Sequence, residues 1–129
     1  MDTQKKRRRI AESIEKKSAW LCGLSDAIWD HPELAFREYF AKELLCDALL
    51  QEGFAVEAPV GGLPTAFLGR YGHGKPVIGI LGEYDALAGL SQQADVPEPR
   101  PLVPRGSGHG CGHNLLGVGS LAAAIAVKE

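Results

Sequence analysis

The sequence predicts an α/β fold in one domain, with helices first, short strands in the middle and a helix at the end. Apolar residues recur at helical spacing early and late in the chain, whereas glycine and proline separate short apolar runs between them. With 129 residues, 45% of them hydrophobic and 23% charged, the chain can bury one core and is too short for a second domain. We therefore expect a single folded unit.

Two helices are expected in the first part of the chain. Residues 6–30 carry apolar side chains at spacings of three, four and seven, which is typical of one buried helical stripe. Pro32 ends this pattern, and the helical pattern resumes over residues 37–51. Cys22 and Cys46 lie within these helices and are expected to pack as small apolar side chains.

The periodicity changes after the second helix. Three short strands are expected, over residues 54–58, 65–71 and 76–81. The glycine-rich residues 72–75 have the composition of a hairpin loop, and His73 at its tip is expected in solvent. A last helix is expected over residues 115–128, with Asn114 as its N-cap residue. The proline-rich residues 83–114 are expected to form a long connection without regular structure.

Charge and cysteine content exclude several classes of protein. A net charge of -2 gives no general attraction to nucleic acid or to an anionic membrane. The basic run Lys5–Arg9 could serve as an import signal or a polyanion patch, but we expect a solvated helix surface paired with Glu12 and Glu15. No secretory signal or membrane-spanning segment is recognisable. Three cysteines at unrelated spacings suggest reduced thiols and a cytoplasmic location.

The segment from Gly108 to Asn114 is the most informative for chemistry, because potential metal ligands alternate with glycines in it. In an extended backbone His109, Cys111 and His113 would project to one side, and imidazole nitrogen and thiolate sulfur bind zinc and related divalent metals. Two alternatives remain open. Cys111 could be a nucleophile activated by a neighbouring histidine, or the segment could be a flexible turn with incidental side chains.

A second candidate group follows the expected third strand. Glu83 and Asp85 stand two residues apart at the carboxyl end of that strand, so their side chains would point together. Such a pair could hold a metal-bound histidine in its working tautomer or touch the metal directly. The alternative is a solvated strand end.

Three motifs together resemble those of the M20 family of amidohydrolases, specifically subfamily D. They are His31-Pro32-Glu33-Leu34 with Phe36 and Glu38, then residues 82–87, then residues 108–114, and they cover nearly the whole chain. The resemblance implies the N-terminal part of a catalytic domain, with helices packed on a mixed β-sheet. It also implies a site for two divalent metal ions, Mn or Zn.

The resemblance also implies roles for individual residues. Cys111 and His113 match metal-ligand positions, and Asp85 matches an acidic residue that supports the site. Glu83 stands where other branches have a histidine ligand, and His109 matches a residue that is not a consistent ligand, so both are further candidates only. Asn114 replaces the aspartate of many members, which bears on substrate or metal preference, and His31 is expected to have a structural role.

The function implied is hydrolysis of an amide or peptide bond next to a glutamate-like carboxylate, by a protein that forms homo- or hetero-oligomers at full length. In the family the general base is one of two adjacent glutamates beyond the cysteine-histidine motif, but here the one acidic residue after His113 is Glu129. We therefore expect residues 1–129 to be part of the catalytic domain, without the smaller lid or dimerisation domain, and to be inactive alone. The alternatives are a fragment of a related dipeptidase and a non-enzymatic module that binds a partner.

Overall fold

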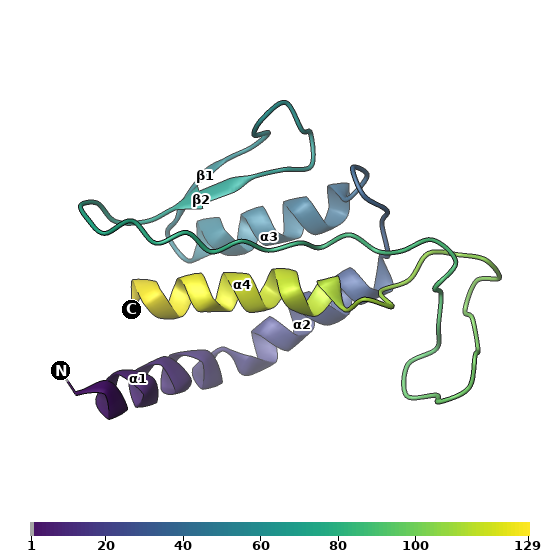
Figure 1. Ribbon diagram of the computed structural model, residues 1–129, viewed down its shortest axis with the longest axis horizontal. Coiled ribbons are helices and arrows are strands. Elements are labelled where there is room, and N and C mark those ends of the chain that lie inside the picture. Colours follow the sequence, from purple (N-terminus) through teal and green to yellow (C-terminus); the bar gives the residue numbers. More distant parts are fainter. Residues whose placement is uncertain (1) are drawn as a thin grey trace.

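A computed structural model describes residues 2–129, and within them it contains four helices and one small sheet (Figure 1). In chain order the elements are α1 (Thr3–Lys16), α2 (Ser18–Asp30), α3 (Tyr39–Gln51), β1 (Ala55–Glu57), β2 (Leu68–Arg70) and α4 (His113–Lys128). The predicted α/β class is therefore confirmed.

The last helix, α4, lies at the centre of the packing. It contacts α1, α2 and α3, and Figure 1 shows it between α3 on one side and α1 with α2 on the other. Buried aliphatic side chains of three helices meet in one core: Leu21, Leu24 and Ile28 from α2, Leu45 and Leu49 from α3, and Val118, Leu121 and Ile125 from α4. Each such side chain contributes about 1.5–3 kcal/mol when it leaves water, so this core holds the helices together.

The first predicted helix is in fact two helices that meet at Lys17, which has non-helical backbone angles. The break lets α1 pack against the end of α4, where the buried Ser13 hydroxyl donates a hydrogen bond to the Glu129 carboxylate at 2.5 Å. The lysine itself donates to Glu52, in the turn after α3, at 2.6 Å. Apolar periodicity carries no information on these polar contacts, which is why it predicted one continuous helix.

The basic run Lys5–Arg9 is exposed on α1, as expected. Its predicted ion pairs with Glu12 and Glu15 are not present among residues 2–129, where Arg9 instead donates to the main-chain oxygen of Glu129. The helical cysteines differ from each other, since Cys46 is buried but Cys22 is exposed, so the prediction for Cys22 was wrong. No helix in the described part of the chain is long and apolar enough to cross a membrane.

The sheet is smaller than predicted. Strands β1 and β2 pair antiparallel, with Ala55 opposite Arg70, and α3 packs against β1. Residues 76–81 run extended in front of α3 and α4 in Figure 1 but form no strand within the described residues, so the third predicted strand was wrong, and the pair is antiparallel rather than part of a mixed sheet. The far end of this segment is held on α4, where the Ser120 hydroxyl donates to the Leu81 carbonyl at 2.9 Å. An apolar groove of about 310 Å³ separates the segment from β2.

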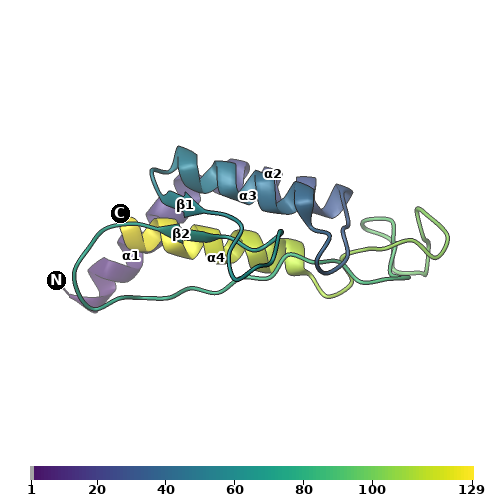
Figure 2. The same ribbon diagram turned by 90° about the horizontal axis from the view of Figure 1, so that it is seen from above.

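The long connection before α4 has no helix or strand, as predicted, and it projects beyond one end of the helices in both views (Figures 1 and 2). Its two ends are tied together, because Leu87 and Gly108 exchange a pair of backbone hydrogen bonds of 3.0 Å. Further along, the backbone of Gln93 donates to the carbonyl of Arg100 at 2.8 Å. The connection is thus a closed excursion from a fixed base.

Two predicted helix starts move by a few residues. Helix α3 begins at Tyr39, and α4 begins at His113 after Gly112, whose φ of 76° is in the left-handed region that favours glycine. Asn114 is therefore not the N-cap. It is buried inside the first turn of α4, and its amide donates to the hydroxyl of Ser25 on α2 at 3.0 Å.

Candidate metal centre

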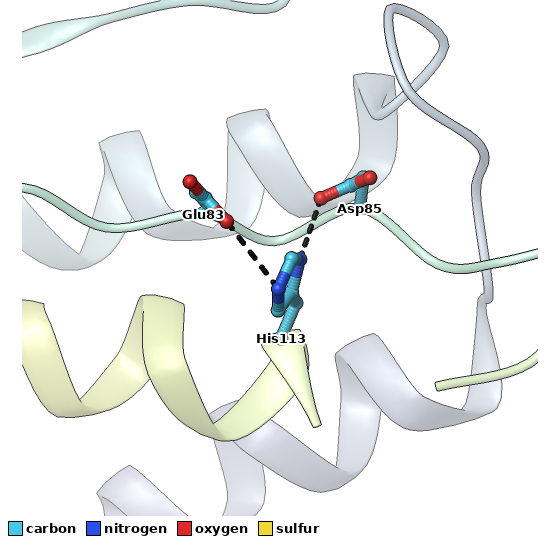
Figure 3. Close-up of side chains that lie close together, drawn as sticks. All are labelled: Glu83, Asp85 and His113. Atoms are coloured by element: carbon cyan, nitrogen blue, oxygen red, sulfur yellow. Dashed lines mark hydrogen bonds and ion pairs between the residues drawn. The ribbon is translucent and has the colours of Figure 1, made fainter. Parts of the chain in front are cut away.

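Two carboxylates hold the imidazole ring of His113 from opposite sides (Figure 3). The Nδ1 atom lies 2.7 Å from Asp85 Oδ1, and the Nε2 atom lies 3.3 Å from Glu83 Oε2. The carboxylates come from the extended chain before the long connection, and the histidine is the first residue of α4. One donor atom from each of the three lies within 4.8 Å of those of the other two, so the group can hold a metal ion.

The short contact fixes how the ring is used. When Nδ1–H donates to Asp85, the lone pair of Nε2 is free and faces the Glu83 oxygen. A lone pair directed at a carboxylate is stable only with positive charge between the two atoms, which a proton or a metal ion can supply. Two ligand atoms about 2.1 Å from a tetrahedral zinc ion are about 3.4 Å apart, close to the 3.3 Å observed.

The donor chemistry of the group suits such an ion only in part. One imidazole nitrogen and carboxylate oxygens are accepted by zinc and manganese. With Asp85 engaged on Nδ1, Glu83 and His113 supply the two atoms that face a shared position. A four-coordinate ion needs further ligands, from Cys111, from water or from other polypeptide.

Close packing of glycines brings the carboxylate segment onto α4. A Cβ atom at Gly117 would lie 3.1 Å from Tyr84 Cβ and 3.2 Å from the Glu83 carbonyl oxygen, and one at Gly82 would lie 2.9 Å from Ser120 Cβ. Larger residues at these two positions would push the chain away from the helix. Gly117 is one turn beyond His113 along α4, so the glycine that permits the approach and the histidine that uses it share one helix face.

The His31 motif anchors the same segment from the other side. The Glu33 carboxylate accepts hydrogen bonds from the backbone amides of Phe40 and Ala41, both at 3.0 Å, and so caps the start of α3. Its backbone carbonyl accepts the amide of Ala86 at 2.7 Å, next to Asp85. Sequence reasoning missed this link, although Glu33 lies within the motif, seven and eight residues before the amides that it caps.

His31 itself has the structural role that was expected of it. Its Nδ1 atom donates to the Ala27 carbonyl at 2.9 Å, and its ring stacks on Phe40 with centroids 4.0 Å apart. The contacts join α2 to the start of α3. His73 is exposed in the loop after β2, also as expected.

The structure does not bring the glycine-histidine segment together in the way the alternation suggested. The segment turns before α4 instead of running extended, so period-two alternation does not apply. His109 is 4% exposed, and its ring lies 6.5 Å from that of Trp29, centroid to centroid. Cys111 is exposed and is not one of the three residues grouped around His113. The ligand role of Cys111 thus stays a prediction.

His109 has an unusual environment. Neither ring nitrogen has a hydrogen-bond partner of normal geometry in the described chain. Burial lowers the pKa of His109, and the nearby carbonyl of Ile28 opposes this only in part, so the ring is neutral near pH 7. The cysteine-nucleophile alternative gains no support, because no hydrogen bond joins Cys111 to a histidine in residues 2–129.

Comparisons with known proteins agree with the motifs. The chain is 52% identical over 122 residues to a p-aminobenzoyl-glutamate hydrolase polypeptide of Escherichia coli, an alignment that covers 95% of this chain and 25% of that protein. It is 34% identical over 134 residues to the Xaa-Arg dipeptidase of Homo sapiens, covering 93% of this chain and 27% of the relative. It is 31% identical over 108 residues to thermostable carboxypeptidase 2 of Saccharolobus solfataricus, covering 82% and 26%. No family model matches the chain.

Over nearly its whole length the chain is therefore a relative of M20-type peptidases and amidohydrolases, as the three motifs predict. Within that group it is similar, at 52% identity, to the Escherichia coli p-aminobenzoyl-glutamate hydrolase. The chain spans about a quarter of the length of the relatives it matches.

Proposed function

We propose that this chain supplies part of the metal centre of an amidohydrolase that cleaves p-aminobenzoyl-glutamate into p-aminobenzoate and glutamate. The observation that carries the proposal is the His113 ring held between Glu83 and Asp85, in a chain half identical to a protein named for that hydrolysis. Zinc and manganese are the candidate metals. Cleavage of a dipeptide is the second candidate, because the Xaa-Arg dipeptidase matches the same region.

In this proposal Asp85 orients the ring through Nδ1, so that Nε2 faces the ion, and Glu83 supplies an oxygen on the same side. Cys111 is proposed as a further ligand because it matches the family's position. A bound divalent ion would polarise the amide carbonyl and activate a water molecule. Both carboxylates near His113 contact its ring, so neither is free to take the proton of that water, and we propose that residues 1–129 bind metal without turnover.

Metal binding tests the centre directly. Zinc and manganese affinities of the chain would be measured by competition with a chelating dye. His113→Ala should lower the affinity by more than about 100-fold, and Asp85→Asn by about 10- to 100-fold because it only orients the ring. His73→Ala is the matched control, since that histidine is exposed in a loop. Equal affinities for the His113 and His73 variants would contradict the proposed centre, and Cys111→Ala decides whether the sulfur is a ligand.

The absence of turnover has its own assay. Release of p-aminobenzoate from p-aminobenzoyl-glutamate would be followed with the chain saturated in zinc or in manganese. We expect no hydrolysis above the metal alone. A rate like that of a complete amidohydrolase would show that a base within these residues had been overlooked.

A further inference from the structure

Residues 76–82 form an extended apolar segment on the surface whose backbone has almost no partners. They make no backbone–backbone hydrogen bond within the described chain, and the Leu81 carbonyl accepts from the Ser120 hydroxyl. Val77 and Leu81 are each 86% exposed, and Ile78 is 64% exposed. Nothing lies within 4 Å of the point where a Cβ atom at Gly79 would be. Exposed, uncharged strands of this kind pair readily with another strand.

We propose that this segment pairs with the same segment of a second copy of the chain, as two antiparallel strands about a twofold axis at Gly79. In that register Val77 lies opposite Leu81 of the second copy, and Ile78 lies opposite Ile80. The branched aliphatic residues therefore meet each other on both faces of the pair.

Charge complementarity selects a second copy of the chain as the partner. The segment holds no charged residue, but Lys75 precedes it and Glu83 follows it. The same register places Lys75 of each copy opposite Glu83 of the other, so the pair is closed at both ends by opposite charges. Lys75 has no ion pair among residues 2–129, and the Glu83 side chain is 59% exposed, so both can reach across.

The size of the contact indicates a weak dimer. The exposed parts of these aliphatic side chains amount to about 200–300 Å² per copy, because full burial of one such side chain removes on the order of 100 Å² from water. With the paired backbone this stays below the roughly 1,200 Å² at which stable interfaces begin. The dimer should therefore form at tens to hundreds of micromolar, a range of about 10⁻⁵ to 10⁻³ M.

Sedimentation velocity on the full chain, with chelator present, tests the proposal independently of any metal centre. Between about 1 μM and about 1 mM the wild type should shift from monomer to dimer. Ile78→Lys should abolish the shift, whereas Leu102→Lys, at a 66% exposed position in the long connection, should leave it unchanged. A monomer throughout, higher aggregates, or a dimer that survives Ile78→Lys would overturn the proposal.

Two further variants test the register. Lys75→Glu and Glu83→Lys should each weaken the dimer by about 5- to 30-fold, and the double variant should restore it, since the charges are then exchanged. In a background of Cys22→Ser and Cys111→Ser, Gly79→Cys should oxidise to a covalent dimer and His73→Cys should not. If the double variant stays weak and Gly79→Cys fails to cross-link, the segments do not meet at Gly79.

Discussion

Substitution of Gly117 tests how the candidate centre is assembled, because no atom of this residue belongs to the centre. In Gly117→Ala the new methyl group would lie 3.1 Å from Tyr84 Cβ and 3.2 Å from the Glu83 carbonyl, so the carboxylate segment must move by a few tenths of an ångström. Overpacking of this kind costs about 1–3 kcal/mol. Alanine in place of glycine also stabilises a helix by about 1 kcal/mol, which partly hides the cost.

Gly119→Ala is the matched control for this experiment. Gly119 is on the same helix, is exposed, and would place its Cβ atom with nothing within 4 Å. Both variants gain the same helix propensity, so the difference in their free energies of unfolding isolates the contact with Tyr84 and Glu83. We expect Gly117→Ala to be about 1–3 kcal/mol less stable than Gly119→Ala in urea.

The same pair of variants should differ in metal affinity. A shift of the Glu83 oxygen relative to His113 Nε2 should weaken zinc binding by about tenfold in Gly117→Ala and leave Gly119→Ala like the wild type. If the two variants unfold at the same urea concentration and bind zinc equally, close packing of the segment on α4 is not what forms the centre.

Two further predictions concern stability. The Lys17 amine, by a hydrogen bond, and then Lys128 hold the pKa of Glu52 below its ordinary value of 4.5 against the effect of burial, so its stabilisation is complete above that value and is lost as the pH falls through the lowered pKa. Glu52→Gln should therefore cost about 1–3 kcal/mol in urea at about pH 7 and much less at about pH 3, and a cost independent of pH would refute this assignment. Asn114→Asp should destabilise the chain by about 1–3 kcal/mol at neutral pH, since a buried carboxylate would face the Ser25 carbonyl without a proton to donate, and thermal unfolding equal to that of the wild type would contradict it.

The parts of the fold that depend on local pattern could be predicted from the sequence. Helices α2, α3 and α4 follow from apolar periodicity, and the irregular connection follows from its prolines. The break at Lys17 could not be predicted, because it depends on Ser13 and Lys17 finding Glu129 and Glu52, which are distant in sequence. The third strand failed for the opposite reason, since residues 76–81 have strand composition but a strand also needs a neighbour.

The candidate centre was foreseen in outline and not in its geometry. Asp85 and His113 came from the motifs, and the structure places them 2.7 Å apart. Alternation predicted that His109, Cys111 and His113 share one extended strand, but Gly112 adopts a left-handed conformation and His113 already belongs to a helix. The change from period two to period 3.6 within the motif separates side chains that an extended chain would align. Gly117 gave no signal at all, because the need for a small residue there comes from a segment far away in the chain.

The hydrogen-bonded base of the long connection gives this protein freedom of a specific kind. Leu87 and Gly108 sit directly opposite each other, so the chain leaves and re-enters the body at nearly the same place. Everything between them could lengthen, shorten or be exchanged for unrelated sequence while Asp85 and His113 keep their places. Evolution, or a protein engineer, could therefore rebuild the rim of this region without touching its chemistry.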